Sequence, residues 1–324
     1  MRTSPSAVFD DGALQQARRP RRRGSPLRHR LEYALFRLGT GVLFLFPSDW
    51  ASRIGRAAAR LAIRVVPRRR QILLDNLKHA FPEKDAAEVE RLALESVEGL
   101  GAAFFEFLEV SRWTADDMRA RVVPEAVHHL EAARARGKGV IALSAHFGNW
   151  EFAALAGGLI GETISSVARP LDNPLLEAEV SRRRTRFGNR IIAKRDALRE
   201  MLRAMQRNET VAIMIDQNVM AEEATFVPFF GRPAATTASV ALLQRKTDAA
   251  VVPVFAWPAG EGRYRLVFEK PILAEEFADE GVGRAEQVRL ATIRYTEVTE
   301  AVIRQRPEAW LWLHNRWKTQ PTSP

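Results

Sequence analysis

A change in hydrophobic periodicity near Gly137 is the feature that most constrains the fold of this chain. After this residue, short apolar runs rich in β-branched side chains alternate with amphipathic stretches of helical spacing. Such alternation is typical of an α/β fold whose sheet is at least partly parallel. We expect strands at residues 139–145, 163–168, 210–215, 250–256 and 264–268. We expect helices at residues 150–159, 175–187, 196–208, 238–247 and 284–306.

Before Gly137 the chain shows helical periodicity, at residues 54–66, 71–80 and 86–110. In the first of these stretches Arg56, Arg60 and Arg64 follow one another at intervals of four, so they share one face of a helix. The apolar residues of the stretch occupy another face. We therefore predict an amphipathic helix that either lies on anionic lipid or packs against the core.

The first 46 residues join a basic arm to an apolar run. Residues 1–30 carry an arginine cluster interrupted by Pro and Gly, and we expect a disordered basic tail. Residues 31–46 are apolar but include Glu32 and Arg37, and the run is shorter than the roughly 20 residues of a spanning helix. No signal-peptide cleavage site follows it. A helix inserted at or through one membrane, with the arginines on the cytoplasmic side, fits this pattern. An ordinary buried helix is the alternative.

Composition narrows the classes of function. The 324 residues contain 49 Lys+Arg and 39 Asp+Glu, a net charge of +10 that suits nucleic acid, an anionic membrane or an acidic partner. We find no helix-turn-helix, zinc-finger or RNA-binding motif, so no nucleic acid is expected. A non-enzymatic basic protein that binds membrane or nucleic acid remains an alternative. The absence of cysteine excludes a disulfide scaffold, a zinc-thiolate site, an iron–sulfur cluster and a thiol nucleophile.

The segment SAHFGNWE, residues 144–151, carries the strongest chemical signal. His146 falls where an expected strand gives way to a loop, Gly148 permits a turn, and Asn149 is suited to cap the next helix. Catalytic and ligand-binding groups of α/β proteins gather at the carboxyl ends of strands. The pattern therefore places His146 at such an edge.

Glu151 is the candidate partner of His146. In one continuous helix the two side chains would be about 140° apart, but across a strand–loop–helix junction they can meet. A carboxylate there can hold one imidazole nitrogen and leave the other free as a base. An ordinary surface or core pair is the alternative. Metal binding has less support because no HExxH motif is present, and GxGxxG, GxxxxGK[ST] and GxSxG are absent too.

The segment resembles the His-x4-Asp/Glu block of the lipid A late acyltransferases, the lauroyl/myristoyl family of the glycerolipid and lysophospholipid acyltransferase superfamily. Further blocks follow in the family's order. Asp216-Gln217-Asn218 lacks the second acidic residue that is common in the family. The family-like blocks are residues 68–82, 144–151, 167–170, 173–174, 215–217, 226–237 and 310–318, so the resemblance runs from about residue 31 to residue 318.

The resemblance implies an α/β fold of the glycerol-3-phosphate-acyltransferase type. In that fold an αβα sandwich with a mostly parallel sheet is preceded by an N-terminal helical membrane-anchoring region. We accordingly expect three parts. They are a disordered basic tail at 1–30, a helical membrane-associated region at 31–112 and an acyltransferase α/β domain at 113–324.

The resemblance also implies O-acyl transfer from a thioester, on acyl carrier protein or coenzyme A, to a hydroxyl of a glycolipid. A lipid A precursor is the leading acceptor, and a lysophospholipid or another glycolipid is the alternative. His146 would be the general base and Glu151 would orient it. Backbone N–H groups near Gly148 and Trp150 would stabilise the oxyanion.

The remaining expectations concern binding. Arg169 would bind a phosphate or phosphopantetheine, and Asp216 would position Arg169 or a sugar hydroxyl. Gly148 and Asn149 would belong to the substrate site. We expect no metal and no cofactor besides the acyl donor. The expected partners are the acyl carrier protein or coenzyme A thioester, the glycolipid acceptor and an anionic membrane surface. The expected location is the inner membrane, with the catalytic domain on its cytoplasmic face.

Overall fold

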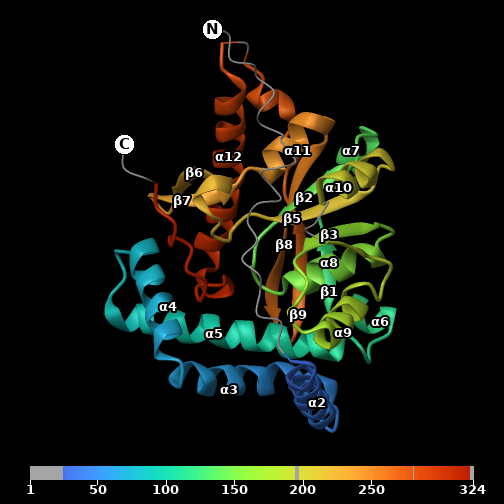
Figure 1. The fold of residues 1–324 in the computed structure, drawn as a ribbon, viewed down its shortest axis with the longest axis vertical. Coiled ribbons are helices and arrows are strands. Elements are labelled where there is room, and N and C mark those ends of the chain that lie inside the picture. Colours follow the sequence, from blue (N-terminus) through green and yellow to red (C-terminus); the bar gives the residue numbers. More distant parts are fainter. Residues whose placement is uncertain (1–24, 194–196, 280, 322–324) are drawn as a thin grey trace.

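The computed structural model describes residues 25–193, 197–279 and 281–321. A central sheet is covered by helices, and a group of N-terminal helices crosses one end of it (Figure 1). Those helices are α2 (Pro26–Leu43), α3 (Ala51–Arg64), α4 (Pro67–Ala80) and α5 (Ala86–Glu109), with the 3-10 helix η2 (Ser48–Trp50) between α2 and α3.

Helix α2 begins earlier than the sequence suggested. The Ser25 side chain accepts a hydrogen bond from the Arg28 N–H, and Pro26 occupies the first helical position. Proline is tolerated there because its missing N–H would have no partner in the helix anyway. Residues 26–30, expected to be disordered, are therefore helical. The rest of the expected tail, residues 1–24, lies outside the described residues.

Helices α3 and α5 touch backbone to backbone. A Cβ atom added to Gly101 of α5 would lie 2.3 Å from the Gly55 carbonyl oxygen and 2.5 Å from the Ala59 Cβ. Only glycine at both crossing positions allows this approach. Helix α5 itself is anchored at its start by a capping box between Asp85 and Glu88.

The rest of the chain, from Ala115 onward, alternates strands and helices. Its first half contains α6 (Ala115–Arg119), β1 (Val122–Glu125), α7 (His128–Ala135), β2 (Val140–Ser144), α8 (Trp150–Leu159), β3 (Ile164–Ala168), α9 (Pro174–Arg184) and β4 (Arg190–Ala193). Its second half contains α10 (Ala197–Gln206), β5 (Thr210–Met214), η3 (Ala221–Glu223), β6 (Ala224–Phe229), β7 (Arg232–Thr237), α11 (Ser239–Thr247), β8 (Ala250–Gly260), β9 (Arg263–Phe268), η4 (Ala274–Phe277), α12 (Arg284–Gln305) and η5 (Pro307–Ala309).

The main sheet has seven strands in the order β1-β9-β8-β2-β5-β3-β4. Strands β8, β2, β5, β3 and β4 are parallel to one another. Strand β9 is antiparallel to β8, and β1 is parallel to β9. Alternate side chains of β2 enter opposite cores, because successive residues of a strand point to opposite faces. Ile141 packs with α10, α11 and α12, and Val140 packs with α7 and α8. The prediction of an α/β fold with a mostly parallel sheet is confirmed.

All five predicted strands are present, and the described residues contain four more. Strands β1 and β4 have four residues each, too few for a period-2 pattern to stand out, and β1 contains Pro124. Strands β6 and β7 form a separate antiparallel hairpin. The N-terminal helices share one core with the alternating part that follows them, because Leu77 of α4 packs in the same cluster as Phe147 and Trp312. Within the described ranges, no helix combines the length and apolarity needed to cross a bilayer.

The backbone contact between α3 and α5 makes a stability prediction. Gly101→Ala should lower the free energy of unfolding by about 1–3 kcal/mol, because the new methyl group would overlap α3. Gly99→Ala, on the same helix, is the matched control. The nearest atom to its Cβ would be 3.8 Å away, so higher helix propensity should stabilise the protein by up to about 1 kcal/mol. Urea denaturation of both variants checks this, and equal effects would contradict the close packing.

Candidate active site

Two side chains meet at the carboxyl ends of neighbouring parallel strands. His146 lies two residues after β2 and Asp216 two residues after β5, and the last residues of these strands, Ser144 and Met214, are paired in register. The His146 Nδ1 atom is 2.9 Å from Asp216 Oδ1. The register of the sheet therefore produces this contact between residues far apart in the sequence.

Asp216 holds the histidine at two points. Its Oδ2 atom accepts the backbone N–H of His146 at 2.8 Å, and it also accepts the indole N–H of Trp310 at 2.8 Å. The carboxylate is buried and acts as an acceptor only. The Nδ1 atom of His146 consequently carries the proton, which leaves Nε2 as the basic nitrogen. Nε2 faces the side-chain amide of Gln217 at 3.1 Å.

The electrostatics of the pair follow from burial and from mutual attraction. Burial alone would lower the pKa of His146, but the charge and hydrogen bond of Asp216 outweigh this effect and raise the pKa above its ordinary value. Burial alone would raise the pKa of Asp216. The His146 ring, the His146 N–H and the Trp310 indole instead hold it at about 2. Asp216 is therefore ionised at neutral pH.

Glu151 does not hold the imidazole nitrogen that we expected it to hold. It lies in the first turn of helix α8, and its carboxylate accepts hydrogen bonds from Arg184 of α9 at 2.6 and 2.9 Å. Asp216 takes the expected place because β5 delivers it to Nδ1 in register. Glu151 still acts on the ring through its negative charge, which helps to raise the pKa of His146. Its catalytic role stays a prediction.

Gly148 and Asn149 shape the turn after β2. Gly148 has φ +56°, and a Cβ there would lie 1.8 Å from the Ala256 carbonyl oxygen, so only glycine fits. Its N–H donates to the Ala309 carbonyl at 2.8 Å and is therefore not free to stabilise an oxyanion. Asn149 is buried, caps α8 by accepting from the Phe152 N–H, and donates to Glu106. Both residues support the turn, and Gly148 also lines the cleft beside His146. Their proposed place in the substrate site stays a prediction.

Arg169 follows β3 and is exposed. The expected pairing with Asp216 is replaced by the bonds of Asp216 to His146 and Trp310. Arg169 lies on the strand-end edge that also carries His146, because β3, β5 and β2 are parallel neighbours. Its proposed contact with a phosphate stays a prediction.

Our sequence analysis assigned no role to Gln217, Arg184 or Trp310. Gln217 and Trp310 lie inside the family-like blocks, but a block does not show which of its side chains points at the histidine. Arg184 belongs to a run of three arginines, and only the turn of α9 shows which one faces Glu151. Arg184 contacts Glu151 across 33 residues of sequence, and Trp310 contacts Asp216 across 94. Neither contact can be read from the sequence alone.

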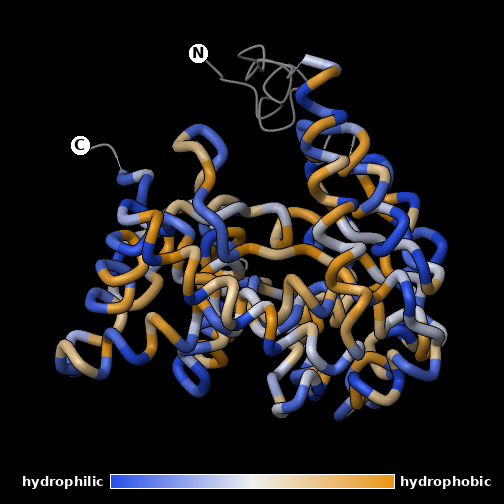
Figure 2. Tube along the Cα trace, turned by 90° about the horizontal axis from the view of Figure 1, so that it is seen from below, coloured by the Kyte–Doolittle hydropathy of each residue, from blue (hydrophilic) through white to orange (hydrophobic). Residues whose placement is uncertain are grey.

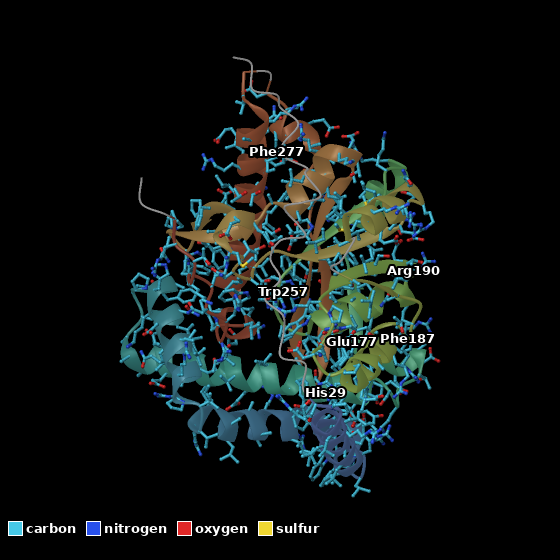
Figure 3. The ribbon with its side chains drawn as sticks, in the orientation of Figure 1. His29, Glu177, Phe187, Arg190, Trp257 and Phe277 are labelled. Atoms are coloured by element: carbon cyan, nitrogen blue, oxygen red, sulfur yellow. The ribbon has the colours of Figure 1, made fainter. Side chains whose placement is uncertain are left out.

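A narrow cleft with room for about one water molecule lies beside His146. Its lining includes Ser96 and Leu100 of α5 together with Gly148, Trp150, Trp310 and Leu311. Phe147, the residue after His146, packs edge-on against Trp257 with ring centroids 5.1 Å apart, and Figure 3 labels Trp257 near the middle of the view. The imidazole therefore faces a cleft while its surroundings are firmly packed.

Comparison with known proteins gives a consistent family. The bacterial lipid A biosynthesis acyltransferase family matches residues 22–319. The lipid A biosynthesis lauroyltransferase of Escherichia coli (strain K12) is 30% identical over 297 residues, covering 89% of this chain and 93% of that protein. The palmitoleoyltransferase of the same organism is 29% identical, covering 89% and 92%. Its myristoyltransferase is 26% identical, covering 83% and 80%.

The contact between His146 and Asp216 predicts a titration. Asp216→Asn removes the negative charge that outweighs burial, so the pKa of His146 should fall by about one unit or more. Glu151→Gln should cause a smaller fall, because Glu151 acts by charge alone. The imidazole resonances of His146 can be followed by NMR between pH 4 and pH 9. An equal fall in both variants would mean that Asp216 is not the direct partner.

Proposed function

Since the chain belongs to the bacterial lipid A biosynthesis acyltransferase family and is an acyltransferase, we propose that it moves a fatty acyl group from a thioester of acyl carrier protein or coenzyme A to a hydroxyl of a lipid A precursor. The observation that carries the mechanism is the hydrogen bond between His146 Nδ1 and Asp216 Oδ1, 2.9 Å long. It leaves Nε2 as a base at the edge of a cleft. An alcohol needs such a base before it can attack a thioester.

In the proposed reaction, Nε2 of His146 takes the proton of the acceptor hydroxyl as its oxygen attacks the thioester carbonyl. Asp216 orients the ring and stabilises the imidazolium, and Glu151 adds negative charge at longer range. The tetrahedral intermediate then expels the thiolate, which receives the proton from His146. The new ester is formed without a covalent bond to the protein.

Gln217 supplies a donor for the developing oxyanion in this scheme. Its amide occupies the position at Nε2 that the substrate hydroxyl would take. Once displaced, the amide N–H groups remain close to the attacked carbonyl, where fixed donors stabilise negative charge. This assignment replaces the N–H of Gly148, which is bonded to Ala309.

The N-terminal helices suit an anionic bilayer surface. Exposed apolar residues recur along one face of α2 at helical spacing, namely Leu27, Leu31, Leu35, Leu38 and Val42. Figure 2 shows hydrophobic and hydrophilic positions alternating along α2, the helix at the upper right. Helix α3 adds exposed Leu61 and Val65 and contains four arginines but no acidic residue. A helix of this type lies in the interface plane, with its apolar face among the lipids.

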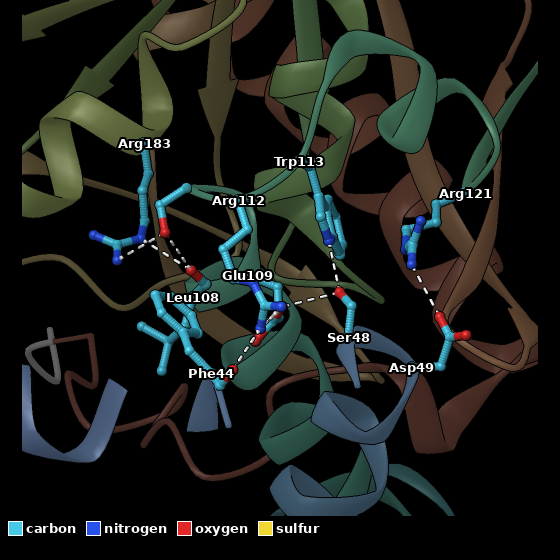
Figure 4. A network of polar contacts seen from close by, with 10 residues as sticks. Phe44, Ser48, Asp49, Leu108, Glu109, Arg112, Trp113, Arg121 and Arg183 are labelled. Carbon is cyan, nitrogen blue, oxygen red and sulfur yellow. Dashed lines mark hydrogen bonds and ion pairs between the residues drawn. The ribbon is translucent and has the colours of Figure 1, made fainter. Parts of the chain in front are cut away.

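The junction between α2 and α3 is fixed to the catalytic part (Figure 4). Ser48 donates to Glu109 Oε2 at 2.9 Å and accepts from the Trp113 indole at 2.8 Å. Asp49 pairs with Arg121 at 3.0 Å. Helix α5 contacts α3 through Gly101 and lines the cleft with Ser96 and Leu100. The proposed lipid-facing surface is thus separated from the cleft by one helix. We place the enzyme on the cytoplasmic face of the inner membrane.

The direct test of the reaction is an assay of the purified protein in mixed micelles with acyl carrier protein and coenzyme A thioesters. His146→Ala should lower kcat by about 10²–10⁴-fold, because the base is lost while binding remains. Its circular dichroism should match that of the wild type. Lipid A precursors, lysophospholipids and other glycolipids are supplied as competing acceptors. Full activity of His146→Ala would refute the mechanism, and preferential acylation of another acceptor would refute the proposed substrate.

Membrane binding makes a separate prediction. Replacing both Leu31 and Leu35 by Glu should weaken binding to phosphatidylglycerol-containing vesicles by at least about 10-fold, because two apolar side chains no longer enter the lipid. Leu290→Glu is the matched control, an exposed leucine on α12 far from α2 in Figure 1. Vesicle co-sedimentation measures both. If the two variants bind equally well, α2 is not the lipid contact.

A further inference from the structure

Trp310 reaches the back of the catalytic pair. Its ring is buried, and its indole N–H donates to Asp216 Oδ2 at 2.8 Å. The neighbouring backbone is tied to the loop of His146: Leu311 N–H donates to the His146 carbonyl at 3.1 Å, and Gly148 N–H donates to the Ala309 carbonyl. Side chain and backbone of this one segment therefore contact both partners of the pair.

We propose that Trp310 is a positioning residue for acyl transfer, whose indole N–H fixes the Asp216 carboxylate and thereby the orientation and tautomer of the His146 ring. The inference rests on the proposed role of His146 as the base. It goes further by assigning the support of the base to a residue that acts on the imidazole through Asp216.

The hydrogen-bond chemistry of an indole explains the assignment. Indole nitrogen is a donor only, so it can pair with the ionised carboxylate but not with a proton on Oδ2. With Oδ2 bonded to the Trp310 and His146 N–H groups, Oδ1 is left to accept from the ring. Without the indole, one backbone N–H would hold Oδ2, and the carboxylate could rotate away from Nδ1.

Trp310 is itself held from the opposite side. Its carbonyl accepts a hydrogen bond from Ser96 of α5 at 2.8 Å, and its ring contacts Phe229 and Trp312 with centroid separations of 5.5 and 4.5 Å. The following segment is tied to α4, where Asn76 donates to the carbonyls of Trp312 and His314. The indole is thus clamped between the N-terminal helices and the catalytic loop.

The charged groups around the pair come from several elements. Glu151 of α8 and Arg184 of α9 act on His146 with opposite signs. In the C-terminal segment, burial lowers the pKa of His314 to about 4, and burial lowers the pKa of Arg316 to about 10, so near pH 7 the former is neutral and the latter is cationic. None of these groups changes when Trp310 loses its N–H. A change in titration can therefore be assigned to the lost bond.

Trp310→Phe removes the donor and keeps an aromatic ring. Loss of orientation should lower kcat about 10-fold with little change in the KM for the acceptor. A carboxylate that can rotate away from Nδ1 should also stabilise the imidazolium less, so the acidic limb of the kcat–pH profile should move down by roughly half a unit. The His146 imidazole titration, followed by NMR, should move in the same direction.

Trp317→Phe is the matched control. Trp317 is also buried against Phe229, but its indole nitrogen has no hydrogen-bond partner among the described residues, so the change removes similar volume and no bond. Ser96→Ala is a second variant that loosens Trp310 without changing the ring, and kcat should fall several-fold. If Trp310→Phe does not fold, the kcat of Ser96→Ala tests the positioning role of Trp310 instead.

The outcomes separate the two proposals. If Trp310→Phe behaves like Trp317→Phe in kcat, pH profile and imidazole titration, the role of Trp310 is overturned. If the wild type transfers no acyl group, or His146→Ala retains full activity, the proposed function is overturned instead. The imidazole titration then still decides whether Trp310 controls the His146–Asp216 pair.

Discussion

The hydrogen bond between His146 and Asp216 is the interaction on which the site depends. It exists because β2 and β5 are parallel neighbours in register, so that the residues just beyond their carboxyl ends arrive side by side. Each member sets the protonation state of the other. The buried carboxylate is ionised because His146 and Trp310 donate hydrogen bonds to it, and the pKa of the imidazole is raised because the carboxylate faces it. The turn at Gly148 and the segment after α12 hold this pair in place through hydrogen bonds to each other, to His146 and to Asp216.

The main features of the fold could be predicted from the sequence, because burial imposes repeating patterns. The long amphipathic helices and the five strands with β-branched runs are examples. The predictions from sequence were wrong where a local feature is compatible with two different structures. Pro26 can interrupt a helix or begin one, and the cap at Ser25 decides for the latter. The short strands β1 and β4 are defined by their neighbours in the sheet and carry too little pattern of their own.

The site was only half predictable for a similar reason. His146 could be found because it stands at the end of a strong strand pattern, and Asp216 because a family-like block contains it. Their contact could not be predicted, because it depends on sheet order, and closeness in sequence favoured Glu151. Only the tertiary structure shows that Glu151 turns to Arg184 and that Trp310 approaches from the other side.

The segment from Ala309 to Leu311 joins elements made at very different times during synthesis. Helices α2 and α3 leave the ribosome early, well before Trp310 is added. A growing chain therefore contains α2 and α3 while the Asp216 carboxylate still lacks its indole donor. Insertion of this segment between α5 and the His146 loop is consequently a late event. The His146–Asp216 pair therefore acquires its full set of hydrogen bonds only after the C-terminal segment has been made.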